Sequence, residues 1–506
     1  MTTAIETRVD TVPGMLDAAL AARPEAYAVR DVHGRWTYAE LDRAADACAE
    51  WLARQGVGAG DRVVARLGNS REFLALMFGT LRLGATFVPL NREMKAYHLR
   101  HVIDDAQPRV VVADDASTVA DVTPLPVWPT ALLTQLVDAP GHPRHRGTGI
   151  DPDDLALLIY TSGSTSVPKA VMSTHRPVLF AAQAIAARLR YRHDDVVLVA
   201  IPLAFDYGLY QVFLSILAGA ELVLTEPSAH VGLISTMHRY GVTVVPIVPS
   251  LGDMLVRLAA RDARPAPPVR MFTNTGAALT GPLIAALRRS FPHAAVYAMF
   301  GITECKRVSI AEPDVDLLKP GSCGTPLDGT EVLILDDAGR VQPPGEPGEI
   351  VVRGPHVMSG YWRAPDLSRE RFRRDPATGR PTLYTGDFGY LDADGHLYFL
   401  GRRDDMFKRR GVRLGALEVE AAARDVPGVR DAALLPPTDG HDMVLFAVVE
   451  PDSGLDAAGL AHRLGERLEK AKVPADCRLL PELPLTPNGK TDKRRLGTLV
   501  PAGQED

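Results

Sequence analysis

Apolar residues recur at helical spacing in the first hundred positions. Thr37 and Glu40 stand three positions apart, which is the pattern of an N-terminal capping box, and apolar residues follow at intervals of three and four until Gly56. Residues 71–83 keep the same period and stop at Gly84, a residue type that often follows the last turn of a helix. Two early helices are therefore predicted, one starting after Thr37 and one spanning 71–83.

Five short runs rich in β-branched and apolar residues lie between positions 196 and 300. Helical patterns separate them, so the order along the chain is strand, helix, strand. This alternation predicts a mainly parallel, doubly wound sheet, because parallel neighbours need a crossover connection between them. The five runs span 196–202, 221–225, 242–248, 269–273 and 294–299.

After about position 320 the pattern changes to strands bounded by turn residues. The runs 330–339, 348–354 and 389–401 are β-rich, and the last of them predicts a hairpin across residues 392–395. The segment 401–411 that follows is dense in charge and poor in apolar residues. It is interpreted as an exposed linker and a domain boundary.

The last hundred residues contain a helix, two strands at 430–436 and 443–450, a helix at 456–472 and a polar tail. This is enough chain for a small α+β domain. The predicted fold class is therefore α/β. A large N-terminal core domain, 1–402, holds doubly wound sheets and a β-rich subdomain, and a small α+β C-terminal domain covers 403–506.

Composition narrows the class of protein. Hydrophobic residues make up 46% of the 506 positions and charged residues 23%, which indicates a folded chain of two or more domains. The net charge of -6 argues against nucleic acid as a partner. We see no signal peptide and no apolar run long enough for a bilayer, so no membrane partner is expected. The four scattered cysteines suit a reducing cytoplasm and give no zinc site.

The segment 160–170 carries the strongest local signal for chemistry. It reads YTSGSTSVPKA and follows the apolar run LALLIY. Glycine and small hydroxyl residues after a strand expose N–H and O–H groups that can hold phosphate oxygens, and Lys169 adds a cation. The spacing is not that of a Walker A loop. On composition alone, a Ser/Thr-rich surface loop is the competing interpretation.

With five further motifs in the same order, the chain resembles the adenylate-forming superfamily of acyl-CoA synthetases, peptide-synthetase adenylation domains and firefly luciferases. The resemblance covers essentially the whole chain. Two positions of the loop depart from the family pattern, because Ser166 and Ala170 stand where glycine is usual. The five further motifs are 300–304, 348–362, 384–387, 401–404 with Lys408 and Gly411, and 487–490.

The resemblance implies an ATP-dependent reaction in which a carboxylate attacks the α-phosphate and expels pyrophosphate. Two anions must meet, so the site has to neutralise charge and hold an in-line geometry. Lys490 would bridge carboxylate and α-phosphate, Thr303 would bond the α-phosphate, and Glu304 would ligate Mg²⁺. The other expected nucleotide contacts are Thr161, Ser162, Gly163, Ser164, Thr165 and Lys169 for the phosphates, Phe300 for adenine, and Asp387 with Arg402 for the ribose.

The family's hinge falls on Asp404. The resemblance implies that the small domain swings about this residue between a pose for adenylation and a pose for thioester formation. The competing interpretation is a charged linker residue with no special role. The basic residues around it are either a solvated face or a contact for CoA or an acidic carrier protein.

Asp206 is the main clue to the acid. Amino-acid-activating members of the family carry Phe-Asp here, and the Asp binds the substrate ammonium. A buried carboxylate needs a cation, so the alternative is internal pairing with Arg307 or Lys306. Bulky Tyr207 and Tyr210 favour a small amino acid such as alanine, glycine or serine. The resemblance places the substrate among Asp206, Tyr207, Tyr210, Pro246, Thr273, Thr275, Gly276, Met299, Arg307 and Val308.

Arg307 keeps a second substrate class open. Its guanidinium could recognise another carboxylate, as in an aspartate-like or β-amino acid. A fatty or aryl acid, activated by an acyl-CoA synthetase, is the third alternative, and Asp206 tells against it. A catalytically silent binding protein on the same fold is the fourth, which the presence of Glu304, Asp387 and Lys490 disfavours.

We expect the acceptor to be a separate protein. The chain ends 16 residues after Lys490, and no carrier segment follows this last motif. It therefore resembles stand-alone adenylation enzymes of natural-product biosynthesis, which load the phosphopantetheine thiol of a free acyl or peptidyl carrier protein. CoA is the alternative acceptor.

Overall fold

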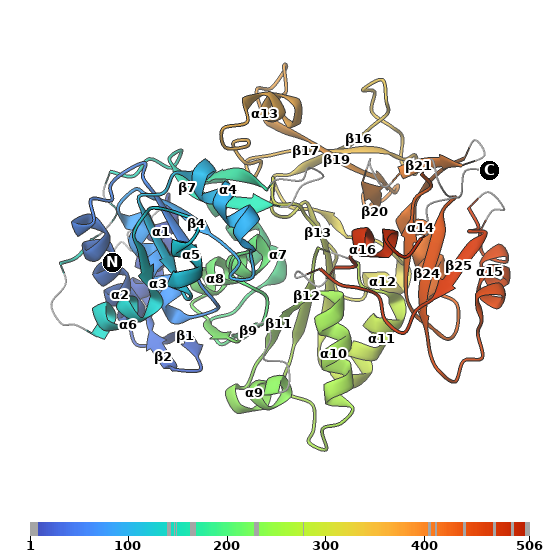
Figure 1. Cartoon of the computed structure of the whole chain (residues 1–506), viewed down its shortest axis with the longest axis horizontal. Coiled ribbons are helices and arrows are strands. Elements are labelled where there is room, and N and C mark those ends of the chain that lie inside the picture. The colour runs from blue at the N-terminus through green and yellow to red at the C-terminus, as the bar shows by residue number, and fades with distance from the viewer. Residues whose placement is uncertain are drawn as a thin grey trace, which may run out of the picture.

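The computed structural model describes most of the chain. The described residues are 9–138, 143–145, 147, 149–161, 168–226, 232–276, 278–402, 406–409, 412–438, 442–468, 472–486 and 490–500. Figure 1 shows a larger N-terminal part, coloured blue to orange, and a smaller C-terminal part in red beside it. No helix in the described part is both long and apolar enough to cross a bilayer.

The first sheet has six strands in the order β6-β5-β3-β4-β7-β8. All neighbours are parallel except β7 and β8, which form an antiparallel hairpin. The strands are β3 (Arg62–Arg66), β4 (Thr86–Pro89), β5 (Val110–Ala113), β6 (Val127–Pro129), β7 (Leu155–Thr161) and β8 (Lys169–Thr174). The accompanying helices are α1 (Val12–Ala22), α2 (Tyr38–Arg54), α3 (Arg71–Arg82), α4 (Ala96–Ala106), α5 (Ala116–Ala120) and α6 (Thr130–Asp138).

Both early helices are confirmed, including their ends. The Thr37 side chain accepts from the Glu40 N–H and the Glu40 carboxylate accepts from the Thr37 N–H, so the capping box at the start of α2 is complete. The helix α3 ends at Arg82, and Gly84 follows with a φ of 68°, a conformation that favours glycine.

The second sheet has nine strands in the order β15-β14-β13-β12-β11-β9-β10-β1-β2. Each of the five apolar runs overlaps one strand, and all five strands lie parallel, as predicted. They are β9 (Val196–Val199), β10 (Glu221–Leu224), β11 (Val244–Ile247), β12 (Met271–Asn274) and β13 (Ala295–Phe300). The edges are β1 (Tyr27–Asp31), β2 (Gly34–Thr37), β14 (Ser309–Ile310) and β15 (Thr325–Pro326).

Helices connect the strands of this sheet, and Figure 1 shows α10 and α11 packed together beside β11 and β12. Each of the parallel strands β9 to β12 is followed by a helix, which carries the chain back for the next parallel strand. The helices are α7 (His175–Leu189), α8 (Asp206–Ala218), α9 (Leu233–Tyr240), α10 (Pro249–Ala259), α11 (Gly281–Ser290) and α12 (Val315–Leu318).

A separate antiparallel sheet forms the predicted β-rich subdomain. Its hairpin across 392–395 is confirmed, because the N–H of His396 and that of Asp394 both donate to the Asp392 carboxylate and close the turn. The members are β16 (Glu331–Leu335), β17 (Gly348–Arg353), β18 (Phe372–Arg374), β19 (Pro381–Leu391) and β20 (Leu397–Arg402), with the helix α13 (Pro365–Arg371).

The interpretation of 401–411 as an exposed linker is wrong for most of the segment that the structure describes. The strand β20 continues to Arg402, and β21 (Met406–Arg409) pairs antiparallel with β22 (Val412–Gly415). Strand pairing uses backbone groups, so a highly charged sequence can form it without an apolar face. Asp404 lies outside the described residues, and the boundary at 402/403 stays a prediction.

The C-terminal part has its own core and a three-stranded sheet in the order β23-β24-β25. The predicted strands are confirmed as β23 (Val429–Leu435) and β24 (Val444–Val449), and α14 (Ala416–Arg424) precedes them. The helix predicted over 456–472 is shorter, since α15 (Ala457–Gly465) ends at a glycine. The polar tail holds β25 (Asp476–Leu479) and α16 (Lys493–Gly497), which were not predicted. The fold class as a whole is confirmed.

Candidate active site

The candidate site begins where parallel strands of the second sheet end. Thr275 and Gly276 follow β12, and Thr303 and Glu304 lie in the loop after β13. Carboxyl ends of neighbouring parallel strands meet at one edge, so these residues are close although they are far apart in sequence. Pro246, on β11, lies opposite Thr273 in the register.

The helix α8 brings Asp206 to this region. Asp206 is its first residue and is half-buried. The turn before it closes when the N–H of Phe205 donates to the carbonyl of Pro202, at 3.1 Å. At Gly208 a Cβ would lie 2.3 Å from that same carbonyl oxygen, so only glycine permits this close packing.

Two tyrosines of α8 lie buried beside it. The Tyr207 hydroxyl donates to the carbonyl of Thr273 at 2.7 Å and lies 2.9 Å from the Thr273 hydroxyl, which ties the helix to β12. The Tyr210 hydroxyl has no hydrogen-bond partner among the described residues. Burial raises the pKa of Tyr210 well above its ordinary value, so its hydroxyl stays protonated.

Two cations are buried against these rings. Lys306 is 1% exposed and Arg307 is 4% exposed. The Arg307 guanidinium lies 5.0 Å from the centre of the Tyr207 ring, and the Lys306 ammonium lies 5.8 Å from that of Tyr210. Burial lowers the pKa of Lys306, while the charges of Asp206 and Glu304 raise it.

These cations are not neutralised within the described part of the chain. The Lys306 ammonium has no hydrogen-bond partner there, and Arg307 donates only from Nη1, to the carbonyl of Lys306 at 2.7 Å. No ion pair within 4.0 Å joins Asp206 to Lys306 or Arg307 in that part. Buried polar groups ordinarily have partners, so this cluster is suited to an anionic ligand.

The expected ribose and adenine contacts lie on adjacent elements. Asp387 on β19 faces Arg402 on β20, and the Arg402 Nε is 3.4 Å from the Asp387 carboxylate. Phe300, the last residue of β13, stacks on Phe399 with ring centres 5.0 Å apart. The expected adenine partner thus already has one aromatic neighbour.

The expected phosphate loop connects β7 to β8, which pair as a hairpin. Thr161 and Lys169 are opposite one another in its register, and the Thr161 hydroxyl donates to the Lys169 carbonyl at 3.5 Å. Ser162, Gly163, Ser164, Thr165 and Ser166 lie outside the described residues. Both ends of the loop are therefore anchored to a sheet.

Glu304 fits a magnesium ligand that acts together with phosphate oxygens. Its carboxylate is half-buried and accepts a hydrogen bond of 2.6 Å from the Tyr361 hydroxyl. No group of three or more His, Cys, Asp or Glu side chains suited to a metal ion occurs among the described residues. Mg²⁺ bound with a nucleotide commonly uses one or two carboxylates together with phosphates and waters, so one hard oxygen ligand is sufficient.

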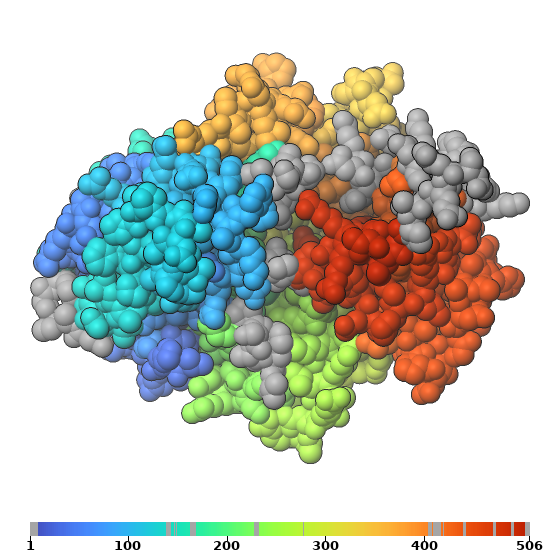
Figure 2. Space-filling model, viewed as in Figure 1, coloured from blue at the N-terminus to red at the C-terminus, as the bar shows by residue number. Residues whose placement is uncertain are grey.

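Lys490 from the C-terminal part reaches the same place. A Cβ at Gly276 would lie 3.8 Å from the Lys490 Cε, so the two parts of the chain touch there. Figure 2 shows the red C-terminal part packed directly against the N-terminal part. Desolvation lowers the pKa of Lys490, and the charge of Arg402 lowers it further. The charges of Asp206 and Asp387 act in the opposite direction.

The structure thus gathers most of the predicted site residues that it describes. Asp206, Asp387, Arg402 and Lys490 are close enough for their charges to interact, although 284 positions separate the first from the last. Met299 is buried on β13, and Val308 is buried beside the end of that strand, where its N–H donates to the Phe300 carbonyl at 2.9 Å. Tyr361 lies in one of the expected motifs but received no role, and Lys306 was expected only as an internal partner of Asp206. The signal available in the sequence was a lysine next to Arg307, two positions after Glu304.

This combination of sheets, motifs and a lysine brought from a small second domain defines an adenylate-forming enzyme. Residues 16–362 match the family described as AMP-binding enzyme, and residues 418–490 match the AMP-binding enzyme C-terminal domain. The chain belongs to this family. It is an adenylate-forming ligase that activates a carboxylic acid with ATP.

The relatives include an enzyme of nearly the same length and a much longer protein of which this chain matches only one part. The chain is 32% identical to a 2-succinylbenzoate–CoA ligase of Geobacillus kaustophilus, covering 98% of this chain and 99% of the relative. It is 29% identical to a dimodular nonribosomal peptide synthase of Bacillus subtilis, over 98% of this chain but only 21% of that protein. The chain therefore spans about a fifth of the synthase.

Solved structures of similar proteins support the same family. VinN is 46% identical to this chain, and the match covers 77% of this chain and 98% of the VinN chain with a TM-score of 0.72. VinN has also been solved with L-aspartate and with 3-methylaspartate. ATP-bound MatB from Rhodopseudomonas palustris is 27% identical over 97% of this chain and 98% of its own, with a TM-score of 0.86.

Proposed function

We propose that this enzyme adenylates an amino dicarboxylic acid of the aspartate type and passes it as a thioester to a separate carrier protein in natural-product biosynthesis. One observation carries the substrate class. Lys306 and Arg307 are buried beside Asp206, and no carboxylate of the described residues pairs with either cation. A substrate with an ammonium and a second carboxylate that does not react offers partners for all three side chains: the ammonium for Asp206 and the second carboxylate for Lys306 and Arg307.

The aspartate class replaces the small neutral amino acids that the bulky tyrosines favoured. Alanine, glycine and serine carry a single carboxylate, and this group must react with ATP. They would leave the buried cations without a partner, which costs roughly 1–3 kcal/mol or more per charged group. The similarity to VinN, which has been solved with L-aspartate and 3-methylaspartate, supports the same class.

The chemistry assigned to the site has two steps. In the first, a substrate carboxylate oxygen forms a bond to the α-phosphorus of ATP, and the bond to pyrophosphate breaks. Lys490 and Thr303 offset the charge at this centre, while Asp387 and Arg402 hold the ribose. Mg²⁺ held by Glu304 would neutralise part of the triphosphate charge.

In the second step a phosphopantetheine thiol attacks the acyl carbon, AMP leaves, and the thiol proton is released. We assign to Asp404 the hinge about which the small domain turns, so that Lys490 leaves the site and the acceptor thiol can enter. The chain has the motifs of a ligase for this step, and its similarity to peptide synthetases supports a carrier protein as acceptor.

A second candidate is an acyl-CoA synthetase for a dicarboxylic acid without an amine. The relative of nearly equal length from Geobacillus kaustophilus, a 2-succinylbenzoate–CoA ligase, favours it. The substrate of that relative also carries a second carboxylate, which would pair with Lys306 and Arg307 while the other carboxylate reacts. It would leave Asp206 without a cation from the substrate.

Acid-dependent exchange of pyrophosphate into ATP tests the proposal. The panel consists of L-aspartate, 3-methylaspartate, L-alanine, β-alanine, succinate, 2-succinylbenzoate and a fatty acid. We expect L-aspartate or its methyl derivative to exceed L-alanine and succinate by at least about tenfold. Asp206→Asn should narrow the gap between aspartate and succinate. A wild-type preference for succinate or 2-succinylbenzoate would transfer the assignment to the second candidate.

A further inference from the structure

Tyr361 joins two parts of the nucleotide site that come from different sheets. Its hydroxyl donates to Glu304 Oε1 at 2.6 Å, and it is the only hydrogen-bond donor to that carboxylate among the described residues. Its backbone forms an antiparallel bridge with Val171, which lies on β8 directly after the expected phosphate loop. The residue therefore contacts both the expected metal ligand and the strand that carries the loop.

The backbone around Tyr361 extends this link. The N–H of Met358 donates to the Glu304 carbonyl at 2.9 Å, which holds the main chain of the acidic loop. On the other side the segment 358–362 makes three backbone hydrogen bonds of 2.9 to 3.0 Å with β8. These bonds are Met172 to Gly360, Ser359 to Met172, and Trp362 to Ala170.

The tyrosine ring has little freedom to turn away. The ring packs edge-on against Phe372, with ring centres 5.2 Å apart, and Tyr361 is only 9% exposed. The Tyr361 N–H donates to the Ser368 hydroxyl at 2.8 Å, and that hydroxyl donates to the Ala364 carbonyl at 2.8 Å. The hydroxyl of Tyr361 is thus fixed at the Glu304 carboxylate before any nucleotide binds.

We propose that Tyr361 is a positioning residue for Glu304 in the binding of magnesium with ATP. By holding Oε1, its hydroxyl fixes the orientation of the carboxylate and leaves Oε2 available as a ligand. Groups that hydrogen-bond a metal ligand typically contribute 10- to 100-fold to metal affinity. The inference rests on the proposed role of Glu304, and the experiment separates the two.

The test uses ATP binding by the full-length protein without an acid substrate, so that no adenylate can form. Isothermal titration gives the dissociation constant of ATP with EDTA and with saturating Mg²⁺, and the ratio of the two constants measures the metal contribution. In Tyr361→Phe this ratio should fall about tenfold or more. Binding of AMP in EDTA should stay within twofold of the wild-type value.

Two further variants make the result specific. Tyr398→Phe is the control, because the Tyr398 hydroxyl also donates to a carboxylate, that of Asp392, at 3.4 Å, without touching Glu304. It should keep the wild-type ratio. Glu304→Gln should bring the ratio close to one, since it removes the ligand itself.

Each alternative outcome has a definite meaning. If Glu304→Gln loses the metal contribution while Tyr361→Phe keeps it within twofold, the positioning role is wrong. If Glu304→Gln keeps it too, the assignment of Glu304 as metal ligand is wrong. If Tyr361→Phe unfolds or weakens AMP binding as much as ATP binding, Tyr361 is only structural, and the inference is overturned.

Discussion

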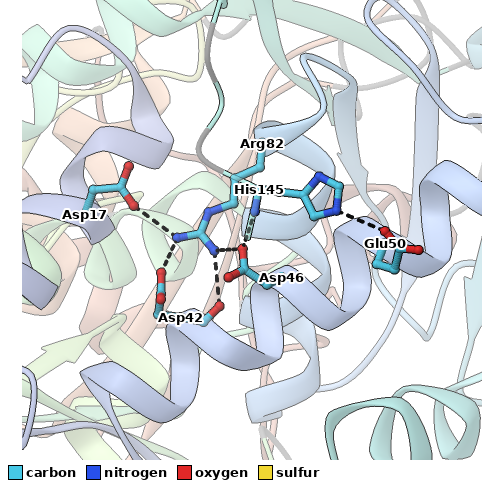
Figure 3. A network of polar contacts seen from close by, with 6 residues as sticks. All are labelled: Asp17, Asp42, Asp46, Glu50, Arg82 and His145. Atoms are coloured by element: carbon cyan, nitrogen blue, oxygen red, sulfur yellow. Dashed lines mark hydrogen bonds and ion pairs between the residues drawn. The ribbon is translucent and has the colours of Figure 1, made fainter. Parts of the chain in front are cut away.

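Arg82 and Lys306 are both fully buried cations, but their surroundings differ. Figure 3 shows Arg82 among Asp17, Asp42 and Asp46, with all three carboxylates turned toward the guanidinium. Its terminal nitrogens pair with Asp46 at 2.7 Å, with Asp17 at 3.1 Å, and with Asp42. Around Lys306, by contrast, the described residues supply no hydrogen-bond partner for the ammonium.

The difference teaches how to separate a structural charge from a ligand-binding one. The Arg82 cluster joins α1, α2 and α3, and its charges are compensated within the protein. The Asp46 carboxylate also accepts a hydrogen bond from the His145 backbone N–H at 3.0 Å, so another group of the protein satisfies it as well. The cluster at Lys306 lies at strand ends, and the described residues do not compensate its charges; under the proposed function, a substrate carboxylate does so.

Removing Arg82 should have the largest effect of any single change on folding. Arg82→Met leaves three buried or half-buried carboxylates without their cation, so the free energy of unfolding should fall by about 3–5 kcal/mol. Urea denaturation followed by circular dichroism measures it. Arg176→Met, which breaks the exposed pair with Asp153, is the control and should leave the midpoint nearly unchanged. An equally stable Arg82→Met would show that the cluster is not structural.

Removing Lys490 should act on catalysis alone. Lys490→Ala should lower the rate of pyrophosphate exchange by roughly 10²–10³-fold, because it removes a positive charge from the point where two anions meet. Its urea midpoint should match the wild type, since the side chain makes no ion pair in the described part of the chain. Wild-type exchange in a folded variant would remove Lys490 from the active site.

Lys306→Met should have the opposite outcome from Arg82→Met: the fold keeps its stability and substrate recognition is weakened. Replacing a buried ammonium that has no partner among the described residues with an apolar side chain of similar size should leave stability unchanged or raise it. At the same time kcat/KM for L-aspartate should fall about 10- to 100-fold, because the second carboxylate loses a charged partner. A variant that loses stability in urea and keeps its aspartate kinetics would place Lys306 with Arg82 as a structural cation.

The smallest expected effect concerns a buried base that carries no charge. Burial lowers the pKa of His356 to about 4, whereas an unfolded histidine has a pKa near 6.5. The unfolded state therefore binds more protons between these values, and stability falls as the pH falls through this window. This linkage amounts to about 1 kcal/mol between pH 6.5 and 5.5.

His356→Phe isolates that contribution, because a phenyl ring can keep the packing against Phe180. The variant should lose about 1 kcal/mol less than the wild type when urea unfolding is measured at pH 6.5 and then at 5.5. His175, whose pKa burial also lowers to about 4, stays in both proteins and cancels in the comparison. Identical pH dependence in the two proteins would contradict the assignment of a neutral buried His356.

Sequence patterns predicted the elements whose signal is local. The parallel strands β9 to β13 follow from apolar runs, and the start of α2 follows from its capping box. The ribbon of β21 and β22 was missed because backbone pairing needs no apolar pattern. The strand β25 and the helix α16 were missed because each is short and half-polar, and only Leu496 and its neighbours in the C-terminal core reveal the packing.

The candidate site could be predicted for residues that belong to the ordered motifs. Contacts between side chains that are far apart in the sequence could not be predicted. Asp387 and Arg402 belong to motifs, and the structure places them opposite one another. The contact between Tyr361 and Glu304 spans 57 positions and depends on the packing of two sheets, so no local pattern contains it. The same holds for the Lys306 ammonium, which has no hydrogen-bond partner among the described residues, because this depends on the residues that the fold brings around it.

The central claim is that Lys306 and Arg307 bind the carboxylate that does not react. The most direct measurement compares wild-type pyrophosphate exchange with L-aspartate, L-asparagine and L-isoasparagine at equal concentrations. Each monoamide keeps the amine and one free carboxylate, and it replaces the other carboxylate by a neutral group of the same shape. The claim predicts that kcat/KM for both monoamides lies at least about tenfold below that for L-aspartate. Equal activity with either monoamide would show that the second carboxylate is not recognised, and it would contradict the claim.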